Sequence, residues 1–206
     1  MAHHAQRRLY SVSAGAPRRA AFGMIATMVA APFLLSQARA VPFDLACSAG
    51  RLNWPGGSTR AAVGKTGVRA DKREGDLATP AGDFPLLQGF DRSDRVEPPP
   101  TALPMRALQP NDAWVDDPAD LRYNHLVETP YPAHVEPLWR KDEIYDLIVV
   151  IGYNMFPTKP GLGSAIFLHV ARKTYSPTVG CVAISRAALL GLLPRLSADS
   201  RLRIAA

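Results

Sequence analysis

A short segment near the C-terminus combines residue types that could carry out nucleophilic catalysis. Cys181 ends the run Thr178-Val179-Gly180-Cys181, and His169 precedes it by twelve residues. A thiol becomes a strong nucleophile when a nearby base removes its proton, and histidine is the usual base near neutral pH. Gly180 lets the backbone approach a bound substrate closely, and the amides of Gly180 and Cys181 could form an oxyanion pocket. If these residues meet in space, the pattern predicts an acyl-transfer site.

Two predicted strands would have to position these side chains, at residues 165–170 and 181–184. If the strands pair antiparallel across a loop centred near Tyr175, His169 and Cys181 become cross-strand neighbours. Opposed residues in such a pair have Cβ atoms roughly 4.5–5.5 Å apart, which suits an imidazole that reaches a sulfur. A cysteine among apolar residues can also be a small buried core residue, so the catalytic interpretation depends on this pairing.

The remaining sequence predicts a mainly β protein. Glycine and proline interrupt the chain every few residues, which favours short strands joined by turns over long helices. We expect one β-sandwich or barrel domain with a single short C-terminal helix, capped by Ser185 and ended by Pro194. The segment 145–151 is nearly all apolar and is expected to be a central strand, buried on both faces. Further strands are expected at 61–63, 84–87, 165–170 and 182–184, with 202–204 as a closing edge strand.

The stretch between Pro98 and Pro137 contains nine of the nineteen prolines. Proline cannot donate to a strand ladder, so this stretch is too proline-rich for central strands. We expect a long ordered excursion. It could form a lid or wall beside the active site, or it could be a structural insertion that only covers sheet edges.

The first forty residues have the composition of an export signal. Arginines precede an apolar run over 20–35, and Ala38-Arg39-Ala40 is a small-residue cleavage pattern. We expect residues 1–40 to be a signal peptide, of either the Sec or the twin-arginine type. Residues 41–206 would then form one domain in the periplasm or cell envelope. Because the apolar run is short, no stable membrane span is expected after cleavage.

Net charge and histidine spacing argue against two other classes of function. Five arginines lie in the leader, and subtracting them from the formal net charge of +6 leaves about +1 for the mature chain. Such a chain carries no electrostatic signature of nucleic-acid binding. His125 and His134 lack ligand spacing with other candidates, so neither a metal nor another cofactor is expected.

The two cysteines, Cys47 and Cys181, leave an ambiguity open. In an exported protein an even pair suggests a disulfide. An oxidised Cys181 could not act as a nucleophile, so the sequence is compatible with either a disulfide or a reactive thiol.

Taken together, the motifs resemble the signature of the L,D-transpeptidase catalytic domain, the YkuD family. That family has a histidine, a loop, and then Ser/Thr-x-Gly-Cys, as in His169 and the run 178–181. Upstream, 79–84 matches its Thr-Pro-x-Gly-x-Phe segment, and 72–76 precedes it as in relatives. The resemblance spans roughly residues 60–204.

Two positions depart from the pattern of many members. Val179 stands where many have histidine, and Ala183 stands where many have arginine or asparagine. This chain therefore resembles a divergent branch of the family. The resemblance implies the family's fold for this chain more strongly than it implies the family's exact substrate.

The resemblance implies an exported cysteine enzyme that acts on peptidoglycan stem peptides. Cys181 would attack the carbonyl of the diamino acid at position three, and His169 would take and return the proton. An acceptor amine would resolve the thioester and form a 3→3 cross-link without a metal or other cofactor. The implied oxyanion or substrate-binding residues are Gly180, Thr178, Tyr153 and Asn154.

Three other interpretations stay open. The same fold could use water as acceptor and act as an L,D-carboxypeptidase or hydrolase. It could also transfer a protein to the wall, or bind the wall without catalysis, with Cys181 structural or bonded to Cys47. The expected partners are peptidoglycan stem peptides, and a monomer is expected.

Overall fold

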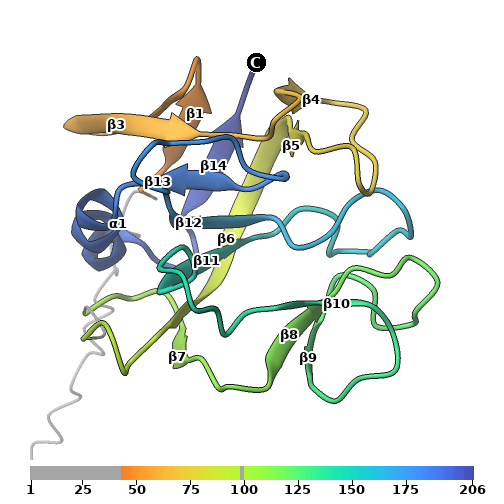
Figure 1. Ribbon diagram of the computed structural model, residues 1–206. Helices are drawn as coiled ribbons and strands as arrows, with labels where there is room; N and C mark the ends of the chain where they lie inside the picture. The colour runs from red at the N-terminus through yellow and green to blue at the C-terminus, as the bar shows by residue number, and fades with distance from the viewer. Residues whose placement is uncertain (1–42, 98–99) are drawn as a thin grey trace, which may run out of the picture. The chain divides into compact units, whose positions relative to one another are not determined.

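A computed structural model describes residues 43–97 and 100–206 of the chain (Figure 1). The predicted signal peptide, residues 1–40, lies outside the described residues. The described part is mainly β with one short α-helix near its C-terminal end, as the sequence predicted. Within these residues, no helix has the length and apolar character needed to cross a membrane.

The strands and the helix are short, as the frequent glycines and prolines predicted. In chain order they are β1 (Leu45–Ser48), β2 (Arg51–Trp54), β3 (Gly57–Ala62), β4 (Val68–Arg69), β5 (Thr79–Pro80), β6 (Gly82–Asp91), β7 (Met105–Ala107), β8 (Asp112–Val115), β9 (Leu126–Glu128), β10 (Val135–Pro137), β11 (Leu147–Ile151), β12 (Phe167–Val170), β13 (Val182–Ile184), α1 (Arg186–Leu192) and β14 (Arg201–Ile204).

Most of the strands form one sheet that closes on itself. Its order is β11-β12-β13-β3-β2-β1-β14-β6-β7, and an additional pairing between β11 and β6 joins the two sides of the run. This closure gives the barrel-like architecture that the sequence predicted. It also leaves few free strand edges, because closure pairs both sides of every strand in the ring.

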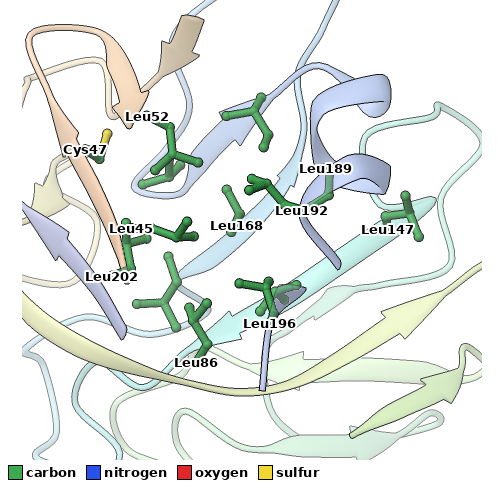
Figure 2. Close-up of a cluster of buried hydrophobic side chains, with 14 of the residues drawn as sticks. Leu45, Cys47, Leu52, Leu86, Leu147, Leu168, Leu189, Leu192, Leu196 and Leu202 are labelled. Atoms are coloured by element: carbon green, nitrogen blue, oxygen red, sulfur yellow. The ribbon is translucent and has the colours of Figure 1, made fainter. Parts of the chain in front are cut away.

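Side chains from all the strands of the ring fill the interior of the closed sheet. In Figure 2, Leu45 and Leu202 from neighbouring strands approach Leu168 of β12, and Leu189 and Leu192 of α1 lie beside it. The cap predicted for α1 is present, since Ser185 Oγ accepts a hydrogen bond from the Ala188 amide. The helix thus covers part of the core inside the ring.

The proline-rich excursion covers the outer face of β11 and β12. It contains a separate three-stranded sheet of order β10-β8-β9. Trp114 of β8 packs edge-on against Phe167 of β12, with ring centroids 5.1 Å apart, and Leu138 joins the same buried cluster. Because residues alternate along a strand, β12 sends Leu168 inward and Phe167 outward, toward the excursion.

The predicted antiparallel hairpin is wrong, because β12 and β13 run parallel. The register pairs Leu168 with Val182 and His169 with Ala183. A parallel pair cannot be joined by a tight turn, so residues 171–181 form a crossover that returns the chain to the same end of the sheet. His169 is therefore not directly opposite Cys181, although both residues still belong to the same face.

The predicted edge position of the last strand is also wrong. β14 lies inside the sheet, parallel to β1 and antiparallel to β6. Its alternating pattern arises because Leu202 and Ile204 face the core while Arg201 and Arg203 face solvent. A strand with one solvated face gives the same sequence pattern as an edge strand.

Candidate active site

His169 and Cys181 line the same cavity, which has a volume of about 200 Å³. Cys181 lies two residues before Ala183, the register partner of His169, so both side chains leave the sheet on its outer face. The end of the excursion, the segment 138–146 that follows it and the crossover complete the walls. The other lining residues are Glu136, Arg140, Ile144, Tyr145, Arg172, Ser176, Pro177, Thr178, Val179 and Ala183.

Cys181 is a buried, neutral thiol at the floor of this cavity. It is only 3% exposed, and its Sγ donates to the carbonyl of Ala165 at 3.2 Å. The amide of Phe167 donates to the same sulfur at 3.4 Å. Burial raises the pKa of Cys181 to about 12 and the charge of Glu136 adds to this, although the Phe167 amide acts in the opposite direction.

His169 is a buried, neutral imidazole whose tautomer can be assigned. It is 5% exposed, and its Nδ1 lies 2.9 Å from the Val170 carbonyl oxygen. A carbonyl can only accept, so Nδ1 carries the proton. Nε2 makes no hydrogen bond among residues 43–97 and 100–206 and keeps its lone pair. Burial lowers the pKa of His169 to about 4. The ring is thus in the form that can accept a proton.

At rest, the hydrogen bonds of the Cys181 thiol go to backbone groups of 165–167 rather than to His169. Both groups are neutral, because burial disfavours the charged form of each. The arrangement therefore suits general-base removal of the thiol proton during attack, rather than a preformed thiolate–imidazolium pair.

Two threonines from distant parts of the chain hold the carbonyl oxygen of Cys181. Thr178 Oγ1 donates to this oxygen at 2.7 Å, and Thr79 Oγ1 donates to it at 3.2 Å. Thr79 also accepts from the Gly64 amide at 2.8 Å. The Thr-Pro segment and the cysteine segment thus meet in space and fix the backbone at Cys181.

The two amides that the sequence analysis expected in an oxyanion pocket differ in their hydrogen bonds. The Gly180 amide donates to Thr178 Oγ1 at 3.2 Å and is already engaged. The Cys181 amide has no acceptor in the described part of the chain, so it is free to bind a developing oxyanion. Gly180 has a φ of +148°, and a Cβ there would lie 3.1 Å from the Ala78 carbonyl oxygen, so glycine suits this position.

Tyr153 and Asn154, expected at the cleft, line neither this cavity nor the other cavity beside Cys181. The Asn154 side chain bonds to the backbone of Lys159 and Gly163, and the Tyr153 hydroxyl donates to the Leu162 carbonyl. Their polar atoms stabilise the loop after β11. The sequence placed them near a strand end correctly but did not show that the loop folds back on them.

The sequence analysis missed Glu136 and Tyr145 as site residues. The Tyr145 hydroxyl donates to Glu136 Oε1 at 2.6 Å, and its ring lies edge-on to His169 at 5.2 Å between centroids. Burial raises the pKa of Glu136. Glu136 comes from the excursion, and only the packing of the excursion on the sheet brings it to Cys181.

A second cavity, of about 190 Å³, also reaches Cys181. It shares Val179 and Glu136 with the first cavity, so Cys181 can be approached from two sides. Its other lining residues are Lys72, Glu74, Gly75, Leu77, Asp116, Ser164, Ala165, Ile166 and Gly180.

Both cysteines are free, which answers the question that the sequence left open. Cys47 is buried in the interior of the closed sheet, whereas Cys181 is buried under the excursion on the outer face (Figure 2 shows Cys47 in the inner cluster). Burial raises the pKa of Cys47 to about 11, so this thiol is unreactive.

The closed β fold, the site and its motifs agree with one protein family. The family model of the L,D-transpeptidase catalytic domain, YkuD, matches residues 47–204, and the chain belongs to this family. No curated protein matches the chain.

Solved structures of mycobacterial L,D-transpeptidases are similar at low identity. L,D-transpeptidase 1 of Mycobacterium tuberculosis is 9% identical with a TM-score of 0.39, over 80% of this chain and 59% of that one. An L,D-transpeptidase from Mycobacterium smegmatis is 11% identical with a TM-score of 0.42, over 80% of this chain and 58% of that one. The chain thus spans less than two thirds of the length of either enzyme.

Proposed function

We propose that the protein is an exported cysteine L,D-transpeptidase that forms 3→3 cross-links between peptidoglycan stem peptides. The observation that carries this proposal is the shared cavity of His169 and Cys181, with Nε2 of His169 left free by the hydrogen bond of Nδ1. Residues 41–206 would be the catalytic domain, and residues 1–40 would direct it to the periplasm or cell envelope.

In the acylation step, a donor stem replaces the Ala165 carbonyl as the neighbour of the thiol. His169 Nε2 takes the thiol proton as Cys181 Sγ bonds to the carbonyl carbon of the third residue. The oxyanion is bound by the Cys181 amide. The C–N bond then breaks, the leaving D-alanine amine takes the proton from His169, and a thioester remains.

In the second step, the side-chain amine of another stem attacks the thioester carbon. His169 accepts a proton from this amine, the C–S bond breaks, and the sulfur recovers the proton as an amide forms. The second cavity supports this order, because it gives an acceptor its own route to Cys181. With water as the acceptor, the same steps would release a tripeptide.

Purified protein incubated with disaccharide-tetrapeptides tests the proposal. Mass spectrometry should detect a thioester on Cys181 and cross-linked dimers. Cys181→Ala should lower dimer formation by on the order of 1000-fold or more. Cys47→Ala is the matched control and should retain transfer, because Cys47 is on the other side of the sheet.

Tripeptide without dimer would instead support a carboxypeptidase. Absence of both products and of the thioester would contradict an enzyme of this type. Export is tested separately, by determining whether the N-terminus of the mature protein from the cell envelope is Val41.

A further inference from the structure

We propose that Arg172 and Arg140 form a subsite for the terminal carboxylate of the donor's leaving residue. The inference rests on the proposed function, since it names the group that this part of the cavity recognises. It assigns a specificity role to two residues that belong to none of the sequence motifs.

The two guanidinium groups share one counter-ion. Arg140 donates to Asp142 in a bidentate pair, with Nε at 2.9 Å and Nη2 at 3.0 Å. Arg172 Nη2 lies 3.5 Å from the same carboxylate. One carboxylate between two guanidinium groups leaves a positive charge in excess at this end of the cavity. Glu136 also lines the cavity, but it is hydrogen-bonded to Tyr145 and burial raises its pKa.

Arg172 is the member of the pair that is free to bind. Its guanidinium makes no hydrogen bond among residues 43–97 and 100–206, and its side chain is 52% exposed. Arg140 is held more firmly, by Asp142 and by the Tyr145 ring 5.4 Å beneath it. A guanidinium binds carboxylates well because its N–H groups match both oxygens.

The chemistry of the leaving group places its carboxylate in the part of the cavity that His169, Arg140 and Arg172 line. When the C–N bond breaks, the leaving amine takes its proton from His169, so that amine must lie next to the imidazole. In an α-amino acid the carboxylate is one carbon away from the amine. Arg140 and Arg172 line the same cavity as His169. Burial is the main cause of the low pKa of His169, and the charges of the two arginines add to it.

The other approach to Cys181 is unsuited to a carboxylate. Apart from Glu136, which lines both cavities, its acidic lining residues are Glu74 and Asp116. The cation there, Lys72, donates to Asp76 at 2.7 Å and is thereby neutralised. A peptide with a terminal carboxylate should therefore place that end at Arg172 rather than in the second cavity.

The test compares two donor tetrapeptides that differ only in a terminal carboxylate or carboxamide. Binding is measured by calorimetry on the full-length protein with Cys181→Ala, so that no reaction occurs. We expect the carboxylate donor to bind roughly tenfold more tightly. Arg172→Gln should remove most of this preference by weakening only the carboxylate donor, and Arg172→Lys should restore part of it.

Lys173→Gln is the control, because it removes a neighbouring charge that lines neither cavity. It should leave the preference unchanged. Equal binding of both donors to the protein with Arg172 intact would overturn the inference. An equal loss of affinity for the two donors in Arg172→Gln would overturn it as well. Binding is measured without turnover, so it tests the carboxylate subsite alone. A failure of acyl transfer in the protein that retains Cys181 would contradict the proposed function instead.

Discussion

Thr79 and Cys181 are 102 residues apart in the sequence, and the Thr79 hydroxyl donates a hydrogen bond to the Cys181 carbonyl oxygen at 3.2 Å. Thr79 is fully buried, and its hydroxyl oxygen also accepts a hydrogen bond from the Gly64 amide. The two most distinctive motifs of the chain are thus parts of one structural unit. The upstream motif holds the backbone of Cys181, which is the nucleophile under the proposed function, and does not contact its sulfur.

This relationship predicts the effect of Thr79→Val, which keeps the shape of the side chain and removes its hydroxyl. The buried Gly64 amide would lose its acceptor, so the free energy of unfolding should fall by about 1–3 kcal/mol. The acylation rate of Cys181 should also fall, because its backbone is less well held. Denaturant unfolding and the rate of thioester formation measure the two effects.

Thr79→Ser is the control for this substitution, since it retains the hydroxyl. It should preserve most of the acylation rate. If Thr79→Val matched the wild type in both measurements, the hydrogen bond to Cys181 would have no positioning role.

A second prediction concerns the protonation of His169. Its pKa of about 4 should appear in an NMR titration of the ring, well below the ordinary value of 6.5. His134 offers an internal contrast, because its hydrogen bond with Asp116 raises its pKa. A His169 resonance that titrates near 6.5 would contradict the buried, neutral imidazole.

The same shift predicts a pH dependence of stability. Above pH 6.5 His169 is neutral in both the folded and the unfolded chain, so its titration does not change the free energy of unfolding there. Between pH 6.5 and about 4 the unfolded chain takes up a proton that the folded one excludes, and stability falls by about 3 kcal/mol in total. In His169→Gln this component should be absent, and denaturant unfolding at several pH values measures the difference.

A third prediction concerns Asn124, which joins the excursion to the loop before β12. Its Nδ2 donates to the carbonyls of Tyr153 and Asn154, and its Oδ1 accepts from Trp114 Nε1 and from the Ala165 amide. Since Asn124 is buried, its replacement by alanine would leave several polar groups without partners. We expect a loss of about 3 kcal/mol of stability, measured by denaturant unfolding.

Leu121→Ala is the matched control in the same excursion, because Leu121 is fully exposed. It should change stability by no more than about 0.5 kcal/mol. Asn124→Ala should also slow acylation, because Ala165 supplies the carbonyl that the Cys181 thiol contacts. Equal stability of the two variants would show that the Asn124 bonds contribute little.

A fourth prediction concerns the state of the thiols. Protein purified without reductant and then denatured should react with two equivalents of a thiol reagent, because both cysteines are free. Cys47→Ala should cost about 1 kcal/mol of stability, since it removes a buried sulfur from the core. An intact mass lower by two hydrogens, with one peptide linking Cys47 to Cys181, would contradict the separation of the two residues.

Several elements could be predicted from local sequence because local rules decide them. The apolar run at β11 gave a buried strand, and Ser185 with the leucines of α1 gave a capped helix. Alternation predicted correctly which residues of β12 share a face with His169. The relative direction of β12 and β13 could not be predicted in this way. It depends on the path of the crossover 171–181, and composition does not determine that path.

The sequence by itself determined that the chain has a mainly β domain with a histidine and a cysteine in a recognisable order. Only the tertiary structure decided which groups surround them. Glu136 comes from the excursion, Arg140 from the segment between the excursion and β11, and Arg172 from the crossover. Their place beside Cys181 results from packing between segments far apart in the chain. Periodicity specifies the face on which a side chain lies, but its neighbours across a cavity depend on non-local contacts, and those contacts define the specificity proposed for this site.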